Sequence, residues 1–203
     1  MKHAVTLLLA LALSLPVLAQ EAAVRQALAR SMPGASIDSV RSSGNWALCG
    51  WSQGDSAGMA LLHRYGKSWE VAQSGGGVMG LTEIALLGVP QGNWMALMGG
   101  PISAEEKQRA QEALAGPNWT WLTQKQGLSA QDLESYTAWE LTLMRNEVFA
   151  LHGRKFSDPE LNACFTMRSW YQPRSDYRDS SLTPTEKANV EFISAYQKKT
   201  GKL

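Results

Sequence analysis

Residues 137–156, TAWELTLMRNEVFALHGRKF, predict one long helix around which the C-terminal part of the chain is built. Thr137 stands three residues before Glu140, which is the spacing of a capping box, where hydroxyl and carboxylate satisfy free amides at a helix start. Gly153 follows the last helical residue, as a left-handed helix end favours. We therefore expect a helix over 138–152. The apolar residues that recur at helical spacing along it are Leu141, Met144, Val148 and Leu151.

A second stripe of the same helix carries the side chains that could contact a ligand. Arg145, Phe149 and His152 follow one another at i, i+4 and i+7, so they share a face next to the apolar stripe. His152 in the last turn also suits the negative end of the helix dipole. This face is a candidate binding surface.

Similar capping patterns recur along residues 128–203, which predicts a small domain of four helices. The further pairs are Ser129 with Asp132, Ser157 with Glu160, and Thr183 with Glu186. Pro159 and Pro184 lie in first turns, where a missing amide does little harm. The last helix is expected over 184–199. The side chains that it should bury are Ala188, Phe192, Ile193 and Tyr196.

Residues 145–156 and the run that follows them resemble the YARHG domain, a bacterial family. Its name comes from a Tyr-Ala-Arg-His-Gly motif, which a Trp-Tyr-x-Pro segment and a Pro-started final helix follow. Here the motif positions are 149–153, with Phe149 in place of Tyr and Leu151 in place of Arg. The resemblance covers about residues 128–199 and implies an extracytoplasmic accessory domain with no assigned reaction. The other matching positions are Arg145, Asn146, Glu147, Phe156, Trp170, Tyr171, Pro173, Leu182, Glu186, Lys187 and Asn189.

Residues 1–19 have the pattern of an export signal. Lys2 supplies the positive start, an apolar run over 4–15 follows, and Val17 and Ala19 fit the small-residue cleavage rule. Cleavage after Ala19 would leave a chain without any apolar stretch of the ~20 residues that a spanning helix needs. We expect a periplasmic or secreted protein with no membrane span after signal removal.

Residues 20–123 predict an α+β domain, and 124–127 a linker to the helical domain. A helix over 21–32 precedes an antiparallel meander with strands at 46–53, 57–65 and 68–73, and Ile37 and Val40 hint at one more strand. Gly66 begins a two-residue hairpin turn. Helices are expected at 79–87 and 104–115, the second with Ser103 and Glu106 as its capping box. Residues 119–122 are expected to form an added strand or a plug between domains.

Charge and cysteine content exclude some functions and leave one question open. The 19 Lys and Arg residues balance 18 Asp and Glu residues, and no basic patch marks a nucleic-acid binder. No cofactor motif and no metal-ligand spacing is present. Cys49 and Cys164 can form a disulfide between the domains in an oxidising compartment. They can equally remain two buried thiols.

Two candidate sites follow from the helical domain, and each has a structural alternative. His152 could act in catalysis with a carboxylate, or it could cap its own helix and bond the 170–178 loop. Trp170 and Tyr171, beside Arg168, Arg174 and Arg178, could hold a sugar or peptide ligand. They could instead anchor an irregular loop on the core. The binding set is His152, Arg145, Phe149, Trp170, Tyr171 and Arg174.

These patterns favour an exported, non-catalytic module that binds a cell-envelope component or an exported protein. No known hydrolase motif is present, which argues against an enzyme. The alternative is an envelope hydrolase that acts on wall peptide or glycan through His152 and a carboxylate. A third hypothesis is an inhibitor whose meander edge docks a peptidase.

Overall fold

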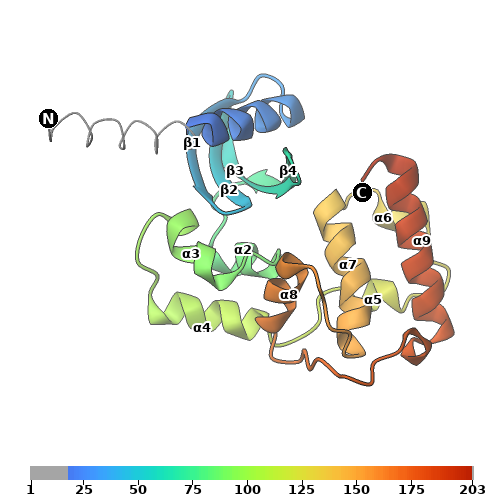
Figure 1. Ribbon diagram of the computed structural model, residues 1–203. Helices are drawn as coiled ribbons and strands as arrows, with labels where there is room; N and C mark the ends of the chain where they lie inside the picture. Colours follow the sequence, from blue (N-terminus) through green and yellow to red (C-terminus); the bar gives the residue numbers. More distant parts are fainter. Residues whose placement is uncertain (1–17, 203) are drawn as a thin grey trace, which may run out of the picture. The chain divides into compact units, whose positions relative to one another are not determined.

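The computed structural model describes residues 18–202, so most of the predicted export signal lies outside the described part. The chain forms two compact units, and the boundary in the sequence falls between Val78 and Met79. The fold class is α+β, as predicted: a helix and an antiparallel sheet come first, and helices follow (Figure 1).

The first unit is a helix packed on a four-stranded meander. Residues 18–31 are helical, and the strands are β1 (Ser36–Ser43), β2 (Trp46–Gln53), β3 (Ser56–Tyr65) and β4 (Ser68–Gly76). All neighbours pair antiparallel in the order β1-β2-β3-β4. Turn glycines with positive φ connect the strands, Gly66 among them as expected.

One face of this sheet and the helix share a core of small and large apolar residues. Val24, Ala27 and Leu28 of the helix pack on Cys49, Trp51 and Trp69 of the sheet, which are all buried. Trp51 and Trp69 of the meander are thus core residues. Alternation along the strands decides which side chains face the helix.

The second unit consists of helices and loops, with no strand among its described residues. Its elements are α2 (Leu81–Leu86), α3 (Gln91–Met98), α4 (Ala104–Ala113), α5 (Thr120–Thr123), α6 (Ala130–Leu133), α7 (Ala138–Leu151), α8 (Pro159–Thr166), the 3₁₀ turn η1 (Asp179–Ser181) and α9 (Pro184–Thr200). Helix α3 was not predicted from the sequence. Residues 119–122 were expected to form an added strand or a plug between domains, and they lie in and next to the helix α5 rather than in a strand.

Residues 79–123 belong to the helical unit, whereas the sequence patterns predict a boundary at 124–127. The reason is a set of long-range contacts that sequence spacing does not reveal. The Trp139 indole N–H donates to the carbonyl of Leu87 at 2.6 Å. The carboxamide of Asn189 donates to the carbonyl of Thr123 and to that of Lys125, which lies within the expected linker.

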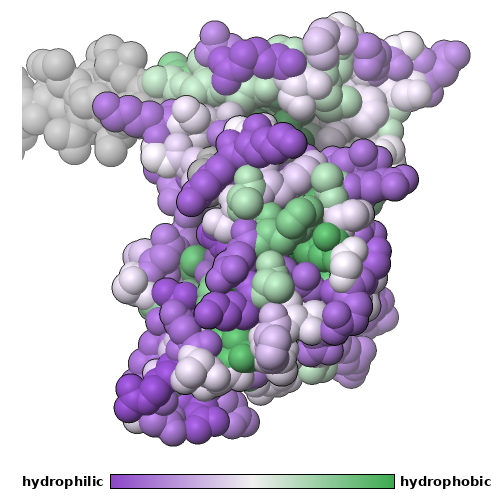
Figure 2. Space-filling view, turned by 90° about the vertical axis from the view of Figure 1, so that its right-hand side faces the viewer, coloured by the Kyte–Doolittle hydropathy of each residue, from purple (hydrophilic) through white to green (hydrophobic). Residues whose placement is uncertain are grey.

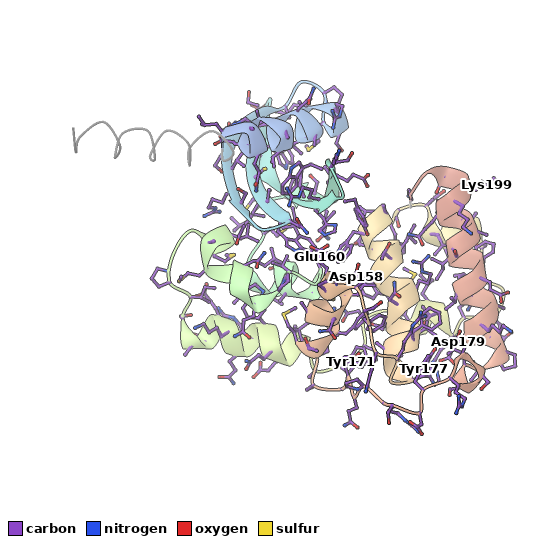
Figure 3. The ribbon with its side chains drawn as sticks, viewed as in Figure 1. Asp158, Glu160, Tyr171, Tyr177, Asp179 and Lys199 are labelled. Carbon is purple, nitrogen blue, oxygen red and sulfur yellow. The ribbon has the colours of Figure 1, made fainter. Side chains whose placement is uncertain are left out.

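Most of the predicted caps are confirmed. Ser103, Ser129, Thr137 and Thr183 each form a capping box with the acidic residue three positions later. The prediction of Ser157 is wrong, because Asp158 is the N-cap of α8. Its carboxylate accepts from the amides of Glu160 and Leu161, both at 2.9 Å, and Figure 3 labels Asp158 and Glu160 at this helix start.

Candidate functional site

Helices α7 and α9 lie side by side and run in opposite directions (Figure 1). The Gln197 carboxamide, near the end of α9, donates to Thr142 Oγ1 near the start of α7 at 3.1 Å. At the other end, His152 Nε2 lies 3.0 Å from Glu186 Oε2. Contacts at both ends therefore hold the pair in register.

Between these contacts the two helices border a groove with two adjoining hollows. The first, which we call the apolar hollow, has a volume of about 600 Å³ and a mostly apolar lining. It is lined by Phe149, Asp179, Ser180, Leu182, Pro184, Lys187, Val190 and Glu191. Figure 3 shows Asp179 on the segment that leads into α9.

The second hollow, which we call the basic hollow, has a volume of about 530 Å³ and is more polar. It shares Phe149, Val190 and Glu191 with the first, so the two form one α7–α9 groove. Three cations face a single carboxylate in its lining. The full lining is Arg145, Asn146, Phe149, Arg154, Val190, Glu191, Ser194, Ala195 and Lys198.

Phe149 is the half-buried residue at the centre of the groove. The guanidinium of Arg154 lies 4.7 Å from the centre of its ring, in cation–π geometry. A guanidinium stacked in this way keeps its in-plane N–H donors free to bind a carboxylate or phosphate. Phe149 and Arg145, both predicted from sequence, are brought together here with Arg154, which was not predicted.

Gly153 sets the direction in which the chain leaves α7. Its φ of +85° is in the left-handed region, as the sequence predicts. A Cβ at this position would lie 2.9 Å from the carbonyl oxygen of Gln172 and closer still to the Arg174 side chain. The carbonyl of Gly153 also accepts from the amide of Arg174 at 2.8 Å. The loop that follows α8 is thereby fixed to the end of α7.

Comparison with known families bears on this helical unit. The family model described as "YARHG domain" matches residues 118–198. Residues 118–198 are therefore similar to the YARHG domain, as the resemblance in the sequence predicts. The preceding residues match no family model, and neither a curated protein nor a solved structure is found to be similar to the chain.

The match to the YARHG domain begins ten residues before the resemblance noted in the sequence, and Glu147 supplies a physical reason. Its fully buried carboxylate accepts from the backbone amides of Asn118 and Trp119 at 2.8 and 2.7 Å. These amides lie at the start of α5, whose free N–H groups need acceptors. Burial raises the pKa of Glu147, while the two amide bonds and the charge of Arg168 oppose that shift.

The aromatic segment of the YARHG-like region packs into a cluster of its own. Tyr171 is buried against Phe165, and Trp170 packs on the same cluster with its ring edge-on to Phe165. The Tyr171 hydroxyl donates to the carbonyl of Arg154 at 2.8 Å. Neither Trp170 nor Tyr171 lines the α7–α9 groove.

Arginines near this segment have different surroundings from those expected. Arg168 was grouped with exposed aromatics, but it is only 2% exposed and donates to the carbonyls of Cys164 and Leu86. Arg174 is exposed and forms a two-bond ion pair with Asp176. The groove therefore contains two of the six predicted binding residues, Arg145 and Phe149.

Some features expected from the sequence concern chemistry rather than binding. Cys49 and Cys164 are free thiols, each buried within its own unit. Burial raises the pKa of Cys49 to about 12 and also raises that of Cys164. Within residues 18–202 no cluster of three His, Cys, Asp or Glu side chains could hold a metal ion.

No helix in the same range is long and apolar enough to cross a membrane.

Proposed function

We propose that this protein is an exported, non-catalytic module that binds a cell-envelope component or an exported protein in the α7–α9 groove. The observation that carries the proposal is the groove itself, where an apolar and a basic hollow adjoin at Phe149, a position of the YARHG motif. Binding sites in general combine apolar lining with a few polar groups that orient the ligand. The export pattern of residues 1–19 supports a location outside the cytoplasm.

The surroundings of His152 support binding over hydrolysis. Its carboxylate partner, Glu186, also accepts from the amide and the hydroxyl of Thr183, both at 2.9 Å. The pair therefore links the end of α7 to the capped start of α9, and it does not line the groove. General acid–base catalysis needs a second positioned reacting group beside the histidine. The two cysteines are poor nucleophiles because burial raises their pKa values.

A tryptophan placed in the groove tests the proposal. Ala195 lines the basic hollow, whereas Ala188 is exposed on the same helix outside both hollows. We expect the mature protein to bind isolated cell-wall sacculi or envelope fractions in co-sedimentation. Ala195→Trp should abolish that binding, and Ala188→Trp should retain it.

Two results would contradict the proposal. Equal binding by both tryptophan variants would place the site elsewhere. Turnover of a wall substrate that His152→Ala abolishes would make the protein a hydrolase.

A further inference from the structure

The α7–α9 groove changes character along its length. At the start of α9 it is bordered by Leu182 and Pro184, and near the end of that helix by Ala195 and Lys198. Lys187 and Lys198 are eleven residues apart, so the stretch of groove between these two lysines is about 16 Å long at 1.5 Å per residue. An extended peptide covers this length with about five residues.

The distribution of charge along the α7–α9 groove favours a ligand with negative groups at one end. In the basic hollow, Arg145, Arg154 and Lys198 face the single carboxylate of Glu191. The apolar hollow has no excess of positive charge, because its lining contains one cation, Lys187, and two carboxylates, Asp179 and Glu191. A ligand with its carboxylates near Lys198 and an apolar group near Leu182 would complement both hollows.

The central aromatic ring favours a peptide over a glycan. Sugars bind aromatic side chains by stacking on an open ring face, but Arg154 occupies one face of Phe149. Arginine also recognises carboxylates with two parallel hydrogen bonds, which suits the aspartate and glutamate side chains of a peptide. Figure 2 views the side of the molecule on which α9 lies, where small hydrophobic areas show between hydrophilic side chains.

We propose that the groove binds an extended acidic segment of a protein partner, about five residues long. An apolar side chain of this segment enters the apolar hollow, and its carboxylates bind Arg145, Arg154 and Lys198. The inference rests on the proposed function and adds the chemistry of the ligand.

The test is an NMR titration of the ¹⁵N-labelled mature protein with the peptide acetyl-Leu-Ser-Asp-Ser-Asp-amide and with its reversed sequence. Matched peptides carry asparagine in place of both aspartates, or serine in place of leucine. At least one of the acidic peptides should shift amide signals of α7 and α9. Both matched replacements should weaken binding.

Two neighbouring lysines supply a control of equal charge. Lys198 lines the basic hollow, whereas Lys199, labelled in Figure 3, lines neither hollow. Lys198→Glu should weaken peptide binding about fivefold, because an attraction becomes a repulsion. Lys199→Glu should leave it nearly unchanged.

The outcomes separate this inference from the proposed function. Equal binding of the asparagine peptide, equal weakening by the two lysine variants, or binding of inorganic tripolyphosphate but of no peptide would overturn the acidic-peptide assignment. If Ala195→Trp still abolishes envelope binding in that case, the groove remains a binding site for another ligand. If Ala195→Trp binds envelopes as the unsubstituted protein does, the proposed function also fails.

Discussion

His152 Nε2 lies 3.0 Å from Glu186 Oε2, although the two residues are 34 positions apart. The contact joins the end of α7 to the first turn of α9, and it lies where the same carboxylate closes the α9 capping box. One oxygen thus serves a helix start and a contact between helices. This arrangement fixes the two helices that border the groove.

Glu186 makes the stability of the helical unit depend on pH. Burial raises its pKa, but hydrogen bonds from Thr183 and His152 outweigh burial and leave the pKa below the usual 4.5. Because the folded pKa is lower than the unfolded one, this stabilisation is present above about pH 4.5 and is lost as pH falls below it. Chemical denaturation at several pH values should show that Glu186→Gln destabilises most at neutral pH and least in acid. A pH-independent difference would contradict the assignment.

Glu147 predicts the opposite dependence. Burial raises its pKa, so its contribution becomes less favourable as pH rises through about 4.5. Glu147→Gln leaves one of the amides of Asn118 and Trp119 without a good acceptor, which should cost about 1–3 kcal/mol. The loss should be larger near pH 4 than at pH 7 in the same denaturation experiment. Glu134→Gln, at an exposed carboxylate, is the control and should have little effect.

Two left-handed glycines separate backbone strain from steric conflict. Gly153 and Gly201 both have positive φ, but a Cβ at Gly201 would meet nothing within 4 Å. We expect Gly201→Ala to cost about 1 kcal/mol of unfolding free energy, from strain alone. Gly153→Ala should cost about 1–3 kcal/mol more, because its Cβ would crowd the backbone of Gln172. Equal losses of unfolding free energy in the two variants would mean that the loop after α8 moves away from the added Cβ at no energetic cost.

The two cysteines should react only after unfolding. Both are buried, and their raised pKa values leave little thiolate near pH 8. Iodoacetamide should therefore label neither Cys49 nor Cys164 in the native protein, and both in denaturant without a reductant. Labelling that requires a reductant would instead support the disulfide that the sequence leaves open.

Local patterns predicted much of this fold, because their causes lie within a few residues. The capping box at Thr137 and the left-handed Gly153 set both ends of α7, and the structure has them as predicted. The α9 core was predicted less well. Ile193 is buried as predicted, but Ala188 is exposed. The polar side chains of Asn189 and Gln197 are buried although they were not predicted to be, because each donates hydrogen bonds within the unit.

Features that depend on distant contacts could not be predicted in this way. Nothing near Glu147 in the sequence indicates that it binds the amide of Trp119, and this bond helps to make residues 79–123 part of the helical unit. The sequence left open whether His152 pairs with a carboxylate or bonds the 170–178 loop, and its partner in the structure is the distant Glu186. Lys198 joins the groove because α7 and α9 run in opposite directions, whereas Arg154 is placed by its stacking on Phe149. Single-sequence periodicity carries no such information.

Site-specific photocrosslinking in native envelopes tests the central claim most directly. A benzophenone amino acid replaces Ala195 in the groove or, as the control, Ala188, an exposed residue two turns earlier on α9 that lines neither hollow. We predict a discrete adduct from position 195 that an acidic peptide competes away, and none from position 188. Adducts of equal yield from both positions, or from 188 alone, would contradict the assignment of the α7–α9 groove as the binding site.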